Sequence, residues 1–421
     1  MKRLALALVL LGLALLSGCG RQQPEARTQL PAPRLTIQTR EGNGVTLQKD
    51  DGYVDALVEI TDVDGTVTRD TARLKVRGNT TAMVTVLKKS YTLKFPKKRN
   101  LLGLGTGRRW VLLANAFDPT LLRNNLANTL ARELDLAYVP ERTYAELWLD
   151  GEFRGCYEVY ELVESGRDRL PLHRGQGDFL VEYEPDREDE PGLTFLDVGG
   201  LRFVLKEPEH PTPQELEQIT ADTEALVALL DEGSEAEIAE RVDVDSFVGY
   251  YLLNEYLKTF DFSKTSVFYY VQDGKLHAGP PWDYDFSTGN LSDTAQAPRY
   301  VGAVDPEGLY LTGKGLYRTL SQRDWFMARV GAAYRAHQDF FDDISADGGL
   351  LDRLLADNRE IFQRNYSPGV WDVSKHWINV QKKPLPTYEE NYDFLKAWLQ
   401  RRNAWLRTYF TESNEADSGG P

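Results

Sequence analysis

The chain divides into a first half rich in short strand-like segments and a second half dominated by long helical segments. Before residue 115, runs of β-branched and aromatic residues alternate with Gly, Asp and Asn turns, which is typical of strands. Five strands are predicted, over residues 35–39, 53–61, 68–76, 90–95 and 110–113. This segregation predicts an α+β fold, with a β-rich N-terminal lobe and a mainly helical C-terminal lobe.

The boundary between the halves carries a helix and a hairpin. Asp118 can cap a helix that starts at Pro119, and leucines at helical spacing follow as far as Leu134. An Asp-Gly turn at Asp150 then joins two strands, over residues 144–149 and 157–160. Further helices are predicted over residues 213–230, 244–257, 321–337, 350–364 and 389–408, and a second hairpin over residues 267–282 interrupts them.

The second hairpin is framed by acidic residues. Asp261 precedes it, and it runs into Trp282-Asp283-Tyr284-Asp285. On an extended segment Asp283 and Asp285 point to one side, where two carboxylates repel unless a cation lies between them. Mg²⁺ or Mn²⁺ with phosphate oxygens would suit that place, as in metal-assisted phosphoryl transfer, and Asp261 could position a hydroxyl. The alternatives are a solvated acidic turn and a plain helix-terminus Asp.

The N-terminus predicts export. Lys2 and Arg3 precede an apolar run over residues 4–16 that is too short to span a bilayer, and Leu-Ser-Gly-Cys ends at Cys19. We expect a lipoprotein signal over residues 1–18, a lipid on Cys19, and an extracytoplasmic protein anchored to the bacterial cell envelope. The alternative is an ordinary secretory peptide with a chance cysteine.

Composition limits the partners of the mature chain. The formal net charge is −15, and losing Lys2 and Arg3 with the signal makes it −17, which argues against nucleic acid as a partner. A neutral or basic partner is expected. Cys156 is the second of two cysteines, so a chain lipidated at Cys19 has no disulfide. We expect a polar linker over residues 19–33 and a disordered acidic tail over residues 411–421.

Ordered blocks of sequence carry a family resemblance. The chain resembles the CotH-type kinases, an atypical protein-kinase-like family named for a spore-coat protein. The resemblance runs over about residues 35–410, and the blocks that carry it are Leu74-Lys75-Val76-Arg77-Gly78-Asn79-Thr80-Thr81, Lys88-Lys89-Ser90-Tyr91-Thr92-Leu93-Lys94-Phe95, Trp110-Val111-Leu112-Leu113-Ala114-Asn115, Leu121-Leu122-Arg123-Asn124, Glu146-Leu147-Trp148-Leu149-Asp150-Gly151, Phe203-Val204-Leu205-Lys206-Glu207-Pro208 and Pro280-Pro281-Trp282-Asp283-Tyr284-Asp285.

The resemblance implies a bilobal protein-kinase-like domain over residues 34–410, with its lobes at about 34–185 and 186–410. It implies an ATP-dependent phosphotransferase that uses Mg²⁺ or Mn²⁺ and acts on Ser or Thr of a surface or envelope protein. In this scheme Asp261 takes the place of the catalytic-loop Asp, and Asp283 and Asp285 hold the metal.

The candidates for binding ATP phosphates are basic residues of the first half. Arg77 lies at a glycine turn. Lys89, which is adjacent to Lys88, and Lys94 follow it in the sequence. Lys94 is the first choice, because it lies on the strand side opposite the core-facing Tyr91, Leu93 and Phe95. For each lysine the alternative is an exposed strand charge that deters aggregation.

Two helix residues complete the predicted site. Arg123, beside an apolar helix face, could contact phosphate, order a carboxylate or only cover the helix with its stem. Glu133 is the candidate for the helix Glu that orients a phosphate-binding lysine in ordinary kinases.

Two departures from ordinary kinases keep a second function class open. Ser266 stands where those enzymes carry a metal-binding Asn, and no Gly-x-Gly-x-x-Gly loop is present. ATP is also scarce outside the cytoplasm. The alternative is therefore a weakly active or inactive lipoprotein that uses the fold for binding, adhesion or coat assembly.

Overall fold

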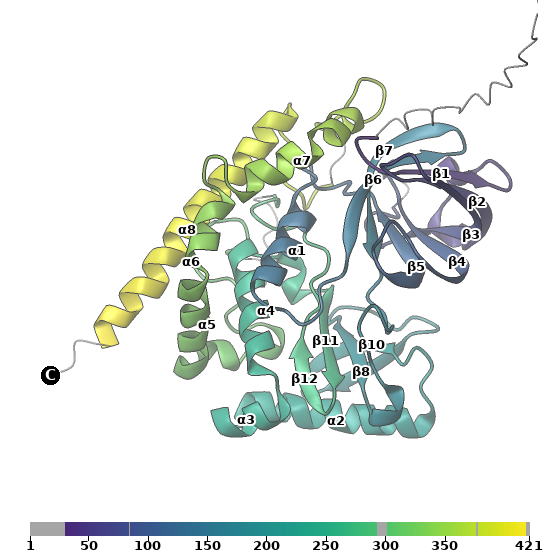
Figure 1. Cartoon of the computed structure of the whole chain (residues 1–421). Helices are drawn as coiled ribbons and strands as arrows, with labels where there is room; N and C mark the ends of the chain where they lie inside the picture. Colours follow the sequence, from purple (N-terminus) through teal and green to yellow (C-terminus); the bar gives the residue numbers. More distant parts are fainter. Residues whose placement is uncertain (1–29, 84, 293–300, 376–377, 418–421) are drawn as a thin grey trace, which may run out of the picture.

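The computed structural model describes residues 30–83, 85–292, 301–375 and 378–417. Two sheets and a layer of helices make up this part of the chain, which confirms the predicted α+β class (Figure 1). The expected signal, Cys19 and nearly all of the linker lie outside the described residues. Among the described residues, no helix combines the length and apolar character needed to cross a bilayer.

The first sheet is a closed barrel of seven strands in the order β1-β2-β3-β4-β5-β7-β6. Its closing pair, β1 with β6, is parallel, while the other neighbours are antiparallel. Closure leaves no exposed strand edge. The strands are β1 (Arg34–Thr39), β2 (Val54–Thr61), β3 (Val67–Arg77), β4 (Ser90–Asn100), β5 (Thr106–Leu113), β6 (Arg142–Leu149) and β7 (Glu152–Glu161).

Alternation along the strands separates an apolar interior from a basic outer face. On β3, Leu74 and Val76 are buried inside the barrel, whereas Arg73, Lys75 and Arg77 point outward. The strand pairing aligns Arg73 with Lys94 of β4, and Lys94 in turn with a basic residue of β5. The barrel thus carries a row of cations across three adjacent strands.

Helix α1 (Arg123–Glu133) begins later than predicted. Leu121 has φ of 61°, a left-handed conformation that a helix cannot contain, so residues 118–122 form a turn instead. The N-cap residue is Leu122 and not Asp118 as predicted, but the Asp118 carboxylate still accepts a hydrogen bond of 2.8 Å from the backbone N–H of Arg123, the first residue of the helix.

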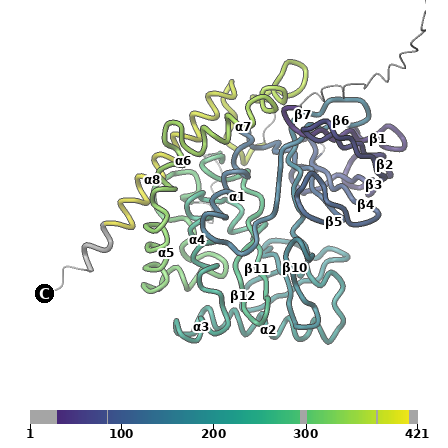
Figure 2. The backbone as a smooth tube through the Cα atoms, in the orientation of Figure 1, coloured from purple at the N-terminus to yellow at the C-terminus, as the bar shows by residue number. Residues whose placement is uncertain are grey.

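The second sheet has five antiparallel strands in the order β12-β11-β8-β10-β9, and Figure 2 shows it below the barrel. The predicted hairpin is present as β11 and β12, but the other three strands were not predicted. The central strand β8 is buried throughout, so its sequence lacks the alternation of apolar and polar residues that identifies a half-buried strand. The strands are β8 (Phe179–Tyr183), β9 (Thr194–Val198), β10 (Leu201–Glu207), β11 (Val267–Gln272) and β12 (Lys275–Ala278).

The observed topology places β8 in the second sheet. The barrel ends with β7, and β8, which precedes the lobe boundary predicted near residue 185, pairs with β10 and β11. The second unit, which consists of this sheet and the helices around it, starts at β8, and the site hairpin belongs to a sheet rather than standing alone among helices.

Most of the helices lie to the left of the two sheets in Figure 1, and α7 packs against β6 and β7 of the barrel. The predicted helices are present, together with the unpredicted short helices α3 and α6. The helices are α2 (Pro213–Glu232), α3 (Glu235–Arg241), α4 (Val244–Leu257), α5 (Asp324–Ala336), α6 (Gln338–Ile344), α7 (Leu350–Asn365) and α8 (Tyr388–Asp417).

Helix α8 is longer than predicted. It continues to Asp417, through residues for which composition predicts a disordered tail. No glycine or proline occurs in this stretch before Gly419, so no residue there breaks the helix. The last residues of the predicted tail, 418–421, lie outside the described part of the chain.

A buried ion pair connects α8 to the central helix α4. The guanidinium of Arg402 lies 2.7 Å from the carboxylate of Glu255, and both side chains are fully buried. Glu255 also accepts backbone N–H groups of Tyr310 (2.8 Å) and Leu311 (2.7 Å). The ammonium of Lys258 donates to three carbonyls of the same loop. These contacts fix the loop that follows the acidic segment in sequence.

Candidate active site

The three predicted aspartates come together beside the end of α4. Asp261 lies in a short 3₁₀ helix (Phe260–Ser263) directly after α4, and only 8% of its surface is exposed. Burial, reinforced by the negative charge of Asp283, raises the pKa of Asp261 to about 8. Such a carboxyl can accept a proton near neutral pH.

Asp283 and Asp285 lie close enough to affect each other's ionisation. Against the effect of burial, the neighbouring Asp285 side chain and the Ser266 hydroxyl both act to lower the pKa of Asp283. Burial and the negative charges of Asp283 and Asp261 hold the pKa of Asp285 well above its usual value. Burial also raises the pKa of Asp283, and the nearby Arg77 opposes this shift. The pair is therefore poised for a cation or a shared proton.

The backbone at this pair is not the extended strand that was predicted. Asp283 has φ of 64°, and Ser266 beside it has φ of 63°. Left-handed conformations at non-glycine residues are strained, and such residues cluster at functional sites. The two carboxyls thus meet through a turn rather than through strand alternation.

Residues before and within α1 hold the acidic segment in place. The amide oxygen of Asn124 accepts the backbone N–H of Tyr284 at 2.8 Å. The amide nitrogen of Asn290 donates to the carbonyls of Asp285 (2.7 Å) and Phe117 (2.8 Å). The segment is therefore fixed at both its start and its end.

Arg123 is one of the residues that hold the acidic segment in place. Its contacts correct the prediction that it binds nucleotide. Its side chain is 1% exposed, and it pairs with Asp118 at 2.5 Å. It also donates to the carbonyl of Ser287 (3.2 Å) and the hydroxyl of Thr288 (2.8 Å). Because these partners surround the guanidinium, Arg123 positions the segment after Asp285 and is inaccessible to a ligand.

The contacts of Lys89 also differ from its predicted role in binding ATP phosphates. Its ammonium is buried and donates to backbone carbonyls of Ala82 (3.2 Å) and Met83. The neighbouring Lys88 is likewise buried and donates to the carbonyl of Cys156 (2.7 Å) and the side-chain oxygen of Asn365 (2.9 Å). Both lysines precede β4 and satisfy carbonyl groups instead of facing the aspartates.

Arg77 faces the acidic pair from the barrel. Its guanidinium carbon lies 5.2 Å from the ring centre of Trp282. One terminal nitrogen of Arg77 is buried without a hydrogen-bond partner in the described part of the chain. An unsatisfied buried donor is costly, so this nitrogen is a natural contact for a bound anion.

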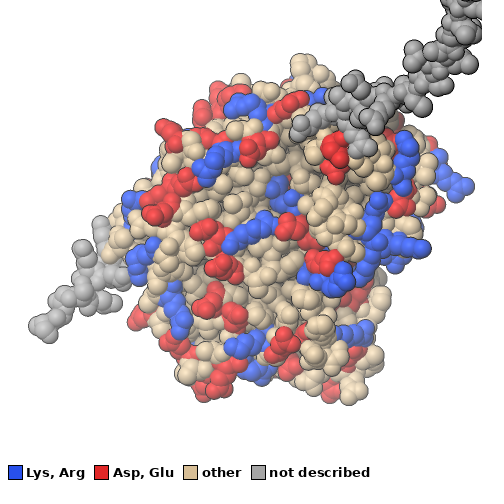
Figure 3. Space-filling view, viewed as in Figure 1, with Lys and Arg blue, Asp and Glu red and all other residues tan. Residues whose placement is uncertain are grey.

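Further cations surround Tyr53 on the same face. The guanidinium of Arg73 and the ammonium groups of Lys75 and Lys94 lie 5.2, 4.9 and 5.5 Å from its ring centre. Burial, together with the positive charge of Arg77, lowers the pKa of Lys75. Within the described ranges Lys75 and Lys94 have no ion-pair partner. Lys and Arg side chains gather over the barrel at the right of Figure 3.

Two glutamates of the site were missed in the sequence. Glu182 of β8 pairs with Lys206 of β10 at 2.9 Å, and Glu184 accepts the hydroxyl of Thr265 at 2.9 Å. Burial and the charge of Glu182 raise the pKa of Glu184 to about 7. The Val-Glu-Tyr-Glu pattern places both carboxylates on one side of the strand, but β8 itself was not predicted.

Near the aspartates, the glutamate that pairs with a lysine is Glu182, and its partner is Lys206. Glu133, the predicted candidate, lies at the end of α1 and pairs with His337 at 3.0 Å. His277 is a strand residue, as expected, and stacks on Tyr270 with ring centres 4.8 Å apart.

The donor set for a metal is incomplete by itself. In the described part of the chain, no group of three or more His, Cys, Asp or Glu side chains converges at ligand distance. Mg²⁺ commonly uses one or two carboxylates and takes its other ligands from water and phosphate. The facing carboxyls of Asp283 and Asp285 fit that pattern.

Comparison with known proteins decides the family. The family model described as CotH kinase protein matches residues 74–406, from within β3 to within α8. The chain belongs to the CotH kinase family. The matched range includes the three site aspartates and the cations Lys75, Arg77 and Lys94. Arg73, which lies beside Tyr53, is just outside it. No curated protein is similar enough to this chain to provide a further comparison.

The shifted pKa of Asp261 predicts how stability depends on pH in metal-free protein. The folded protein holds this proton to about pH 8, whereas an unfolded Asp loses it near pH 4. The folded state therefore binds more protons across this window, so the free energy of unfolding falls as pH rises. Asp261→Asn removes the ionisable group, so the variant does not lose stability in this way. Relative to the native protein, its free energy of unfolding should rise by at least about 1.4 kcal/mol between pH 5 and pH 8.

Chemical denaturation with a chelator present, at several pH values, measures this difference. Asp245→Asn is the control, because the side chain of Asp245 is 94% exposed. Parallel pH profiles for the native protein and Asp261→Asn would contradict the assignment.

Proposed function

We propose that this protein is an ATP- and divalent-metal-dependent phosphotransferase that acts on Ser or Thr of a surface or envelope protein. The observation that carries the proposal is the cluster of buried carboxyls, Asp261, Asp283 and Asp285, next to the cations of the barrel face. Membership of the CotH kinase family supports it at a coarser level.

The barrel and the second unit would act as the two lobes of a kinase-like domain. The barrel supplies unpaired cations, and the second unit supplies the carboxyls. A closed barrel of seven strands is a rigid platform for such cations. Arg77 and Trp282 pack together where the two units meet.

Each residue has a separate role in this proposal. Asp283 and Asp285 would hold Mg²⁺ or Mn²⁺, because their facing carboxyls require a cation once both are ionised. Arg77, Lys75 and Lys94 would bind the ATP phosphates. The metal, when bound, neutralises phosphate charge. Lys75 thus joins Arg77 and Lys94 in place of the excluded Lys89 and Arg123.

Asp261 would position the acceptor and accept its proton. The acceptor oxygen forms a bond to the γ-phosphorus, and the bond from that phosphorus to the β–γ bridging oxygen breaks. ADP leaves with the electron pair of that bond, and the hydroxyl proton passes to Asp261. The raised pKa of Asp261 suits a base that works near neutral pH.

Separate measurement of turnover and binding tests these roles. Asp261→Asn should lower phosphate transfer from labelled ATP by about 10²–10⁴ and leave Mg²⁺-dependent ATP binding nearly intact. Asp283→Asn should instead weaken that binding by tenfold or more, because a metal ligand is lost.

Calorimetry and a transfer assay on the same preparations provide both quantities. If native protein binds ATP with Mg²⁺ or Mn²⁺ but transfers no phosphate, the alternative role holds, that of a binding, adhesion or assembly lipoprotein. Ser266 in place of a metal-binding Asn is the feature that favours this alternative. Unchanged turnover in Asp261→Asn would remove Asp261 from catalysis.

The barrel cations make a second prediction. Lys94→Ala and Lys75→Ala should each weaken ATP binding by about tenfold, since hydrogen bonds to charged groups contribute about 1.5–3 kcal/mol. Lys98→Ala is the matched control, because Lys98 lies on the same strand β4 but is exposed beyond the cation cluster. Equal affinities in all three variants would place the phosphates elsewhere.

We also propose that the mature chain is anchored to the bacterial envelope by a lipid on Cys19. The support is the short apolar run that ends at Leu-Ser-Gly-Cys. Intact mass of the protein purified from membranes should correspond to a chain that begins at a lipid-modified Cys19. A mature chain that begins at another residue without lipid would refute this anchor.

A further inference from the structure

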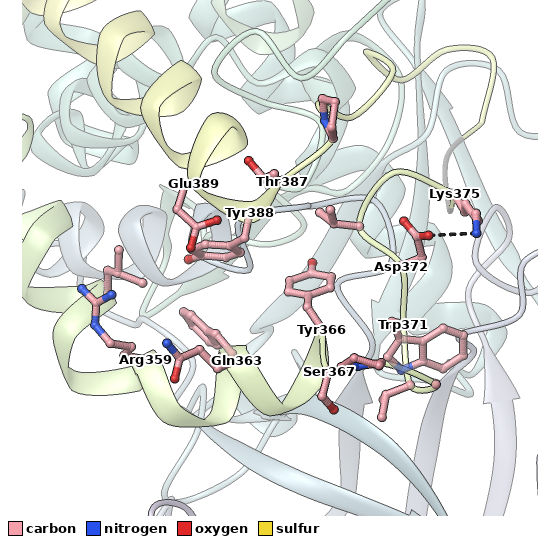
Figure 4. Close-up of a pocket in the computed structure, with 17 residues that line it drawn as sticks. Arg359, Gln363, Tyr366, Ser367, Trp371, Asp372, Lys375, Thr387, Tyr388 and Glu389 are labelled. Carbon is pink, nitrogen blue, oxygen red and sulfur yellow. Dashed lines mark ion pairs between the residues drawn. The ribbon is translucent and has the colours of Figure 1, made fainter.

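A cavity lies apart from the aspartates. It has a volume of about 830 Å³ and is bounded by α7, the loop that follows α7, and the first turn of α8 (Figure 4). This volume is within the range of small-molecule sites, about 300–1,000 Å³. None of the carboxyls or cations assigned to phosphate transfer lines it.

Aromatic rings form the middle of this cavity. Tyr366 and Tyr388 have ring centres 5.8 Å apart, and their hydroxyls donate to the carbonyls of Pro119 and Thr120, each at 3.0 Å. The indole N–H of Trp371 donates to the carbonyl of Arg154 at 2.8 Å. The polar tips are thus used within the fold. The guanidinium carbon of Arg154 lies over the Trp371 ring, 4.8 Å from its centre, so the remaining surface of that ring and the surfaces of the two tyrosine rings line the cavity.

Hydrogen-bonding side chains stand beside the rings. Arg359 and Gln363, one turn apart on α7, are exposed and form no hydrogen bond or ion pair within the described part of the chain. Figure 4 shows them at one end of the cavity, opposite Trp371 and Lys375. They offer planar, multidentate groups to a ligand that lies on the rings.

The charges of the lining balance. Lys375 pairs with Asp372 at 3.0 Å, and the positive Arg359 is offset by the negative Glu389. A site for a strongly charged ligand would carry an excess of one sign. The cavity therefore favours an uncharged, polar ligand.

The backbone around the cavity has little to offer a peptide. Groups in the interior of α7 and α8 are bonded along the helices. At the start of α8, the N–H groups of Thr387 and Glu390 donate to side-chain oxygens at 2.9 and 3.2 Å. In the loop, Val370 and Lys375 donate to the carbonyls of Ser367 (3.0 Å) and Asp372 (3.2 Å). Peptides are often recognised through a free strand edge or an apolar groove for a helix, and this lining is neither. Recognition must come from ring faces and polar side-chain tips.

We propose that this cavity binds an uncharged glycan chain. The sugar rings pack their C–H faces on Tyr366, Tyr388 and Trp371, and their hydroxyls pair with Arg359 and Gln363. The assignment is independent of phosphate transfer, because it uses none of the same side chains.

Binding of neutral tetrasaccharides to the full chain tests the site. Calorimetry with cellotetraose, chitotetraose and maltotetraose, without nucleotide, should detect binding of at least one at millimolar concentration or below. The double variant Arg359→Ala/Gln363→Ala should weaken that binding by about tenfold or more, because each lost hydrogen bond contributes about 0.5–1.5 kcal/mol.

Two variants serve as controls. Glu360→Ala changes an exposed residue of α7 that does not line the cavity, and Asp283→Asn changes the candidate active site. Both should keep the native affinity for the sugar, and the double variant and Glu360→Ala should keep the native melting temperature. Absence of binding by every sugar, equal affinity in the double variant, or selective binding of uncharged hexapeptides in their place would overturn the proposal.

Discussion

The repulsion among three buried aspartates is the constraint on which the candidate site depends. Burial raises the pKa of each of these three carboxyls. Neighbouring negative charge adds to the shift: Asp283 acts on Asp261, Glu182 acts on Asp283, and both Asp283 and Asp261 act on Asp285. Such a cluster does not hold itself together, so other contacts must fix it. Asn124, Asn290 and the Arg123–Asp118 pair supply them through backbone groups of the acidic segment.

The same reasoning applies to the cations of the barrel. Arg73, Lys75 and Lys94 share one tyrosine ring and repel one another, and burial adds to the cost for Lys75. Rigid strand pairing holds them in register despite this repulsion. Each cluster is unfavourable alone, and each has the charge that a metal–phosphate complex would neutralise.

Local pattern was sufficient to predict most strands and the long helices. Alternation identified the barrel strands, and the two-residue spacing of Asp283 and Asp285 brought attention to the pair. The central strand β8 was missed because it is buried on both faces, and with it Glu182 and Glu184 were missed. Barrel closure was also beyond local pattern, because it depends on the parallel pairing of β1 with β6.

The basic residues that the structure places away from phosphate are held by contacts that local pattern does not contain. Lys88 reaches Asn365, and Arg123 reaches Ser287 and Thr288, so partners distant in sequence decide the role of each charge. Lys94 differs because its direction follows from the strand on which it lies, with Leu93 and Phe95 in the core. Lys89 precedes the same strand, where alternation no longer sets direction, and its ammonium turns to loop carbonyls. A charged residue can therefore be assigned from sequence where a regular element fixes its side, whereas in a connecting segment its partner must be known first.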